Sequence, residues 1–72
     1  MKLIKGFHNT STIDFVTYVL EEIESLGIAT ESAEAEPNTG IPRFEYIKNG
    51  KVVAKKIGKY SIDDYRKWAT SF

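Results

Sequence analysis

Hydrophobic and polar positions change their spacing several times along the chain, and each change predicts a new element. Residues 2–8 form an apolar-rich run that Asn9-Thr10-Ser11 interrupts, which predicts a short strand. The next stretch carries apolar residues at helical spacing and predicts a helix over about 12–26. Its apolar positions are Ile13, Val16, Val19, Leu20, Ile23 and Leu26. We expect Ser11 to cap the start of this helix and Gly27 to end it in the left-handed conformation.

Three further strands and a second helix follow. Residues 28–33 predict a weaker strand, and the Pro, Asn and Gly content of the segment after it predicts a loop. Asn49-Gly50 separates two β-prone runs, 43–47 and 52–57, which is a strong hairpin signal. Ser61 then predicts the cap of a closing helix, whose apolar face carries Ile62, Tyr65, Trp68 and Ala69.

The predicted fold class is therefore α/β, in the α+β sense of a mixed sheet. The element order is β-α-β-β-β-α, in which the first two strands are parallel because a helix connects them, and the last two form an antiparallel hairpin. Alternating polar and apolar residues in the strands suit a sheet covered on one face. We expect one domain over residues 1–72, with four strands and both helices on the same face.

Composition excludes several classes of site. The 72 residues include no Cys and one His, which excludes disulfides, thiolate metal sites and multi-His sites, so we expect neither a metal nor a cofactor. The sequence has no apolar run approaching the ~18 residues of a membrane span, and we expect a cytoplasmic protein with no membrane contact.

Charge is segregated although the net charge is zero. The segment 6–42 contains seven acidic residues and no Lys or Arg, whereas 43–72 contains eight basic and three acidic residues, a net charge of +5. Such a layout either steers a partner or lets the two halves neutralise each other within the fold.

The C-terminal half resembles a thioredoxin. The landmarks are Gly40-Ile41-Pro42, then Lys48-Asn49-Gly50-Lys51-Val52-Val53 and Ile57-Gly58, followed by a capped helix; they cover about 39–69. Residues 2–31 fit the strand–helix–strand unit of the family by pattern. The resemblance implies a minimal thioredoxin-like domain, close in size to a glutaredoxin.

The family's redox motif is missing. The two cysteines of Cys-X-X-Cys would fall on Ser11 and Asp14, and neither side chain can carry out thiol–disulfide exchange. A hydroxyl–carboxylate pair could also belong to a hydrolase, but helix capping explains both residues and no base is placed beside the serine. We therefore expect a protein without enzyme activity.

The resemblance also implies a substrate groove. In the family the bond before the landmark proline is cis, so Ile41-Pro42 is expected to be cis, with the backbone of Ile41 beside residues 10–13. The expected partner-binding residues are Thr10, Ser11, Thr12, Ile13, Ile41 and Pro42. The alternative is that Pro42 only starts a strand.

The sequence thus predicts a redox-inactive, protein-binding accessory or inhibitor module. The partner would be another protein, and an extended segment of it would occupy the groove. The uncovered sheet face is a second candidate surface, which could support a homodimer. The competing hypothesis is a nucleic-acid-binding module that uses the basic hairpin and final helix. Tyr46, Tyr60 and Trp68 are interleaved there with basic residues, which are Lys48, Lys51, Lys55, Lys56, Lys59, Arg66 and Lys67. Such lysines also protect an edge strand from aggregation.

Overall fold

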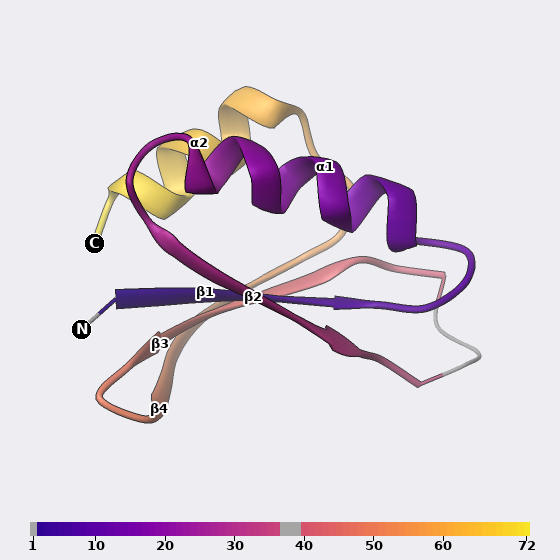
Figure 1. Cartoon of the computed structure of the whole chain (residues 1–72), viewed down its shortest axis with the longest axis horizontal. Helices are drawn as coiled ribbons and strands as arrows, with labels where there is room; N and C mark the ends of the chain where they lie inside the picture. Colours follow the sequence, from indigo (N-terminus) through magenta and orange to yellow (C-terminus); the bar gives the residue numbers. More distant parts are fainter. Residues whose placement is uncertain (1, 37–39) are drawn as a thin grey trace.

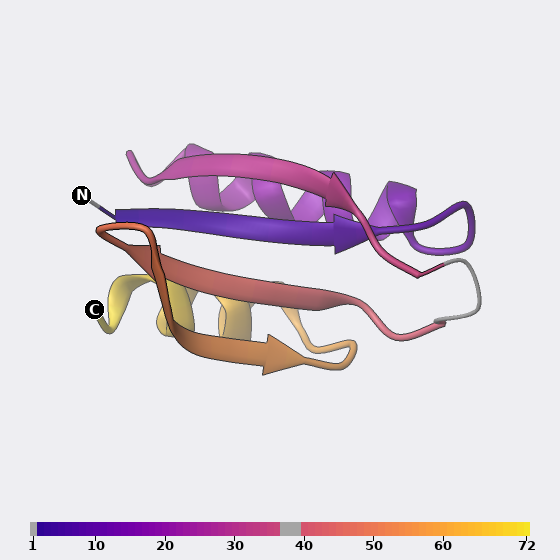
Figure 2. The ribbon, with the colours of Figure 1, turned by 90° about the horizontal axis from the view of Figure 1, so that it is seen from below.

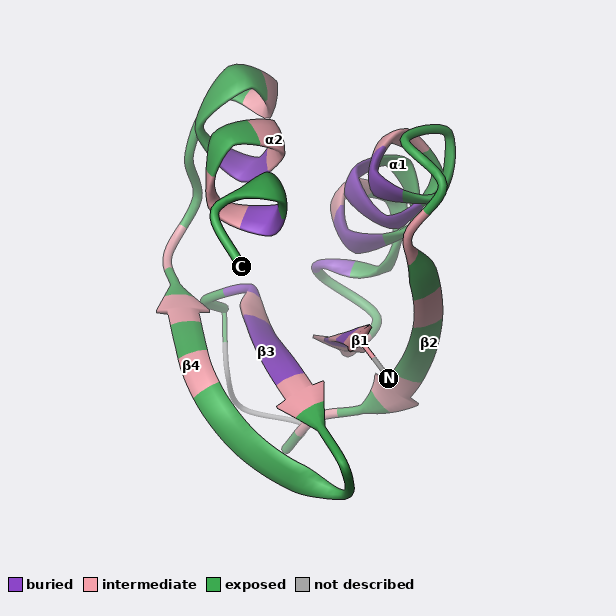
Figure 3. Ribbon diagram, turned by 90° about the vertical axis from the view of Figure 1, so that its left-hand side faces the viewer, coloured by how far each residue is buried: buried purple, intermediate pink, exposed green. Residues whose placement is uncertain are grey.

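Two helices cover one face of a four-stranded sheet in the computed structural model, which describes residues 2–36 and 40–72 (Figure 1). In chain order the elements are β1 (Lys2–His8), α1 (Ile13–Glu24), β2 (Ala29–Glu34), β3 (Arg43–Lys48), β4 (Lys51–Ile57) and α2 (Ile62–Thr70). The predicted element order is confirmed. The end-on view of Figure 3 also confirms that both helices lie on the same side of the sheet.

The strand order is β2-β1-β3-β4, so β1 and β3 are central and β2 and β4 form the edges (Figure 2). β1 pairs with β2 in parallel, as the sequence predicts, and it also pairs antiparallel with β3, which joins the parallel pair to the hairpin. The β3–β4 hairpin turns at Asn49 and Gly50, whose φ angles of 52° and 78° suit the predicted two-residue turn.

The core lies between the sheet and the helices. Its fully or nearly buried members are Ile4, Val16, Val19, Leu20, Ile23, Phe44, Tyr46, Tyr65 and Ala69. Phe44 and Tyr65 pack edge to face with ring centroids 4.9 Å apart, which joins β3 to α2. Arg66 forms ion pairs with Glu22 and Asp63, so it also links α2 to α1.

The start of α1 differs from the prediction. Thr12, not Ser11, is the N-cap residue, and its side chain makes no capping bond to the helix. The Asn9 side chain accepts a hydrogen bond from the Ser11 N–H at 2.9 Å, and the Asn9 N–H donates to Thr12 Oγ1 at 3.0 Å. Asn9 therefore forms a turn in which the Thr12 hydroxyl accepts a hydrogen bond from the Asn9 N–H and does not cap the helix. The helix consequently begins at Ile13.

The prediction of a cis Ile41-Pro42 bond is wrong, because no peptide bond within the described ranges is cis. The trans form of an X-Pro bond is favoured by ~0.5–1 kcal/mol unless the surroundings reverse the preference. Pro42 directly precedes β3, and its carbonyl accepts a hydrogen bond from the Gly58 N–H at 2.9 Å. A proline at the start of a strand needs no N–H of its own there, as in the alternative interpretation of Pro42.

The capping of α2 is confirmed. Ser61 has an extended backbone, and its hydroxyl accepts a hydrogen bond from the Asp64 N–H at 3.2 Å. Tyr65 and Ala69 are buried on the face that the sequence predicts.

Candidate functional site

The two segments of the predicted groove lie at the same end of the sheet. Residues 10–13 follow β1, and residues 41–42 precede β3. Because Phe7 pairs with Arg43 in the antiparallel β1–β3 ladder, both connections leave the sheet at one end (Figure 2).

The predicted groove residues differ in their exposure. Thr12 is only 6% exposed, and Pro42 is also buried. Ile13 and Ile41 are 42% and 55% exposed, and Thr10 and Ser11 are exposed as well. Thr12 and Pro42 therefore hold the connections in place, and the other four residues present side chains at this end of the molecule.

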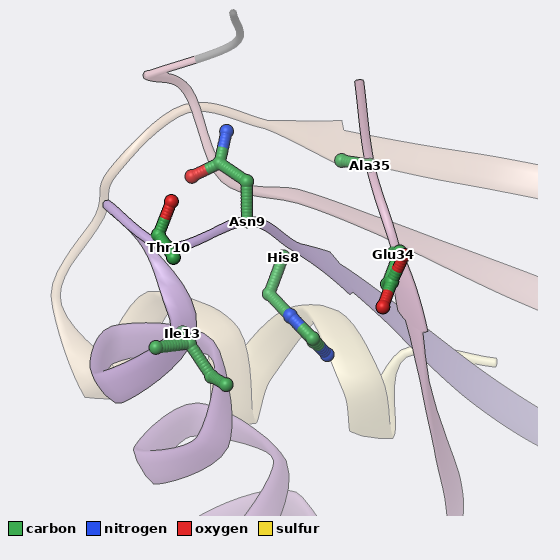
Figure 4. A pocket seen from close by; sticks show the side chains of 6 residues that line it. All are labelled: His8, Asn9, Thr10, Ile13, Glu34 and Ala35. Carbon is green, nitrogen blue, oxygen red and sulfur yellow. The ribbon is translucent and has the colours of Figure 1, made fainter. Parts of the chain in front are cut away.

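A hollow of about 310 Å³ opens beside these residues, between the start of α1 and the end of β2. It is lined by His8, Asn9, Thr10, Ile13, Glu34 and Ala35. Figure 4 shows His8 and Glu34 projecting from neighbouring strands, with Ile13 facing them from the helix. The hollow thus includes Thr10 and Ile13 of the predicted site, while Ile41 and Pro42 are not among its lining residues.

A second hollow, of about 250 Å³, follows along the same two elements. Thr17, Leu20, Glu21 and Glu24 line it from α1, and Thr30, Glu31 and Ser32 line it from β2. We call the two hollows together the α1–β2 groove. Glu34 and the β2 side of this groove were not among the predicted site residues. The sequence signal for them is the helix that connects two parallel strands, because such a connection places β2 beside β1 under the same helix.

The α1–β2 groove is acidic. Glu21, Glu24 and Glu34 line it and are exposed; Glu31 borders it, but its side chain shares the opposite face of the sheet with Lys5. Glu24 accepts a hydrogen bond from Thr30 Oγ1 at 3.2 Å, and Lys5 lies 3.3 Å from Glu31. Lys5 reaches Glu31 from the neighbouring strand, whereas the chain between Gly6 and Pro42 supplies no basic side chain other than His8. The segregation seen in the sequence therefore becomes a negatively charged groove.

One wall of the groove is an edge strand. Among the described strands β2 pairs only with β1, so alternate N–H and C=O groups of its backbone point away from the sheet. Figure 3 shows that β2 is largely exposed along its length. Such an edge can accept an extended chain as an additional strand.

The basic half of the molecule is arranged differently. The Lys56 ammonium lies 4.1 Å from the centroid of the Tyr60 ring, and the Lys59 ammonium lies 5.1 Å from that of Phe15. These lysines cover the aromatic faces that a nucleic-acid base would need for stacking. Lys48, Lys51 and Lys55 remain exposed on the hairpin.

Comparison of the chain with protein-family models, with curated proteins and with solved structures finds no match. Within residues 2–36 and 40–72, no three His, Asp or Glu side chains gather in a way that could hold a metal ion. In the same part of the chain neither helix is long and apolar enough to cross a bilayer.

Proposed function

We propose that this protein is a non-catalytic binding module that holds an extended, basic segment of a partner protein in the α1–β2 groove. The observation that carries the proposal is the combination of an exposed edge strand with three carboxylates, those of Glu21, Glu24 and Glu34, along one groove. The edge would supply main-chain hydrogen bonds, and the carboxylates would select lysine or arginine at alternate positions of the segment.

The thioredoxin-like resemblance supports a binding role at this end of the molecule. We propose that the chain is a minimal, cysteine-free variant of that architecture. The element order, both helices on one face, the Asn49-Gly50 hairpin and Gly58 ahead of α2 agree with it. The trans bond before Pro42 departs from it, so the partner segment is assigned to the β2 edge rather than to the backbone of Ile41.

Nucleic-acid binding is the second candidate, and the exposed lysines of the β3–β4 hairpin support it. We favour protein binding because Lys56 and Lys59 lie over the rings of Tyr60 and Phe15, which are then covered on one face.

The test uses two synthetic ten-residue peptides in which threonine alternates either with lysine or with glutamate. Titration into isotopically labelled protein should shift the backbone resonances of residues 29–34 with the lysine peptide, and leave them in place with the glutamate peptide. Glu21→Lys should weaken binding of the lysine peptide by roughly threefold to tenfold, because one attractive charge becomes repulsive. Asp63→Lys is the matched control: this exposed acid lies on α2, so binding should be unchanged.

Equal weakening by both variants would assign the binding to net charge and would contradict a defined groove. If the lysine peptide shifts the resonances of residues 10–13 and 41 but not those of β2, the binding site is the one predicted from the sequence. Shifts confined to the hairpin upon addition of a single-stranded oligonucleotide, lost steeply with salt, would favour the second candidate.

A further inference from the structure

The face of the sheet opposite the helices carries an ordered set of side chains. In β1, Ile4 and Gly6 are buried toward α1, so Leu3, Lys5 and Phe7 project from the other face. Residues directly paired on neighbouring strands share a face, so the register identifies the rest of this surface.

Three rows cross the open face from β2 through β1 and β3 to β4. The first row is Ala33, Phe7, Arg43 and Ile57; the middle row is Glu31, Lys5, Glu45 and Lys55; the third row is Ala29, Leu3, Ile47 and Val52. Ile57, Val52 and the neighbouring bulge residue Val53 are about half exposed, at 53%, 49% and 56%. The middle row therefore alternates in charge, and a mainly apolar row flanks it on each side.

We propose that a second copy of this chain docks on the open face, related by a twofold axis that runs parallel to the strands between β1 and β3. This operation places β2 of one copy over β4 of the other, and β1 over β3. Glu31 then faces Lys55 of the other copy, and Lys5 faces Glu45, which is largely buried in its own chain with its carboxylate 3.6 Å from Arg43 Nε. Every charge in the middle row meets its opposite, which is the self-complementarity that a twofold interface requires.

The flanking rows match under the same operation. Leu3 faces Ile47 of the other copy, Ala29 faces Val52, and Ala33 faces Ile57. Phe7 faces Arg43, and these two residues already stack within one chain, with the guanidinium carbon 4.0 Å from the ring centroid. Apolar residues thus meet apolar residues, and the aromatic ring meets a cation.

The charge alternation also selects the axis. A twofold axis perpendicular to the strands would place Glu31 over Glu31 and Lys5 over Lys5, so the same row would repel. Face-to-face packing of two sheets with nearly aligned strands is a common arrangement, in which the sheets lie ~10 Å apart.

The area of the open face is small. Four strands ~4.8 Å apart and six residues long at ~3.3 Å each give a projected area of about 400 Å² per copy. A face of this size lies at the small end of protein interfaces, so we expect a weak, reversible dimer.

Substitutions that reverse the charge of Glu31 or of Lys55 test the dimer, because both residues are exposed and lie on the edge strands of the sheet. Sedimentation equilibrium of the whole chain should give a mass rising from 8.2 kDa toward twice that value as concentration increases to about 1 mM. Glu31→Lys alone and Lys55→Glu alone should each raise the dissociation constant at least about tenfold, since each creates two like-charge contacts per dimer.

An equimolar mixture of the two variants should dimerise again, because opposite charges then meet at both contacts. Lys67→Glu is the control: it makes the same charge change at an exposed position on α2 and should leave association unchanged. Circular dichroism establishes that each variant is folded. A wild-type mass that stays at 8.2 kDa, an effect of Lys67→Glu equal to that of Lys55→Glu, or a mixture that remains monomeric would each overturn the proposal.

Discussion

At Gly6, β1 lies against α1 with no room for a side chain. A Cβ atom built at this position would lie 2.8 Å from Val16 Cγ1 and 2.9 Å from Leu20 Cδ1. Both contacts are with buried side chains of the helix, so the conflict can be relieved only by moving core residues. The glycine thus determines how closely the helix approaches the sheet.

We expect Gly6→Ala to lower the free energy of unfolding by about 1–3 kcal/mol, as overpacking of a core does. Urea denaturation measures this change. Gly40→Ala is the matched control, because among the described residues, its neighbours in sequence aside, no heavy atom lies within 4 Å of a Cβ atom built there. Equal stabilities of the two variants would show that α1 yields readily to the added methyl group.

Nothing in the sequence distinguishes Gly6 from any other glycine in a strand. The alternation of side chains along β1 places Gly6 on the helix-facing side, because Lys5 and Phe7 on either side of it face the other way. The distance to Val16 and Leu20 depends on how the helix packs, and this is a property of the folded chain.

The two helices begin in different ways, although Ser-x-x-Asp precedes or opens each of them. At α2, Ser61 accepts the hydrogen bond that the sequence predicts, and Asp63 and Asp64 lie in the first turn. At α1, Ser11 lies in a turn controlled by Asn9, and its side chain does not cap the helix. The same motif therefore has different outcomes, because only the first helix has a competing Asn two residues earlier.

This difference predicts unequal effects of two serine substitutions. Ser61→Ala should reduce the free energy of unfolding by ~1 kcal/mol, since an orphan N–H of α2 loses its acceptor. Ser11→Ala should change it by less than ~0.5 kcal/mol, as at other exposed positions. Chemical denaturation of both variants at neutral pH measures the pair. A larger loss for Ser11→Ala would restore Ser11 as the cap of α1.

For the molecule as a whole, Tyr65 joins α2, the Gly58–Tyr60 connection and the core. Its hydroxyl donates to the Gly58 carbonyl at 2.7 Å and accepts from the Tyr60 N–H at 3.2 Å, and its ring packs on Phe44 and Phe15. Desolvation by burial is the main cause that raises the pKa of Tyr65 above its ordinary value of 10.0.

The raised pKa predicts the sign of a pH effect. Above pH 10.0 the unfolded chain loses the phenolic proton while the folded chain still holds it, so stability falls as pH rises through the folded-state pKa. Tyr65→Phe removes this contribution and also removes the two hydrogen bonds, at a loss of ~1–2 kcal/mol near neutral pH. Its free energy of unfolding should therefore decline less steeply above pH 10.0 than that of the wild type.

Urea denaturation at a series of pH values provides the comparison. Tyr18→Phe is the control, because this residue is 50% exposed on α1. Parallel pH profiles for Tyr65→Phe and the wild type would contradict the role assigned to the buried hydroxyl.

Features that depend on a few neighbouring residues followed from the chain alone. The strand over residues 2–8, the Asn49-Gly50 turn and the Ser61 cap were each predicted and confirmed, because alternation, positive φ and capping act over short distances. The covered and open faces of the sheet followed from the same alternation.

Features that join distant segments depended on the folded chain. The acidic groove exists because the helix connection brings Glu21 and Glu24 beside β2, and the charged row exists because register aligns Lys5 with Glu31 and Glu45. The Asn9 turn and the trans bond before Pro42 also depended on the folded chain. The turn reflects a competition between two sets of hydrogen bonds, and the trans bond a competition between two isomers. Local patterns indicate where an element runs and which side it buries, whereas contacts between elements depend on register and packing, which many residues determine together.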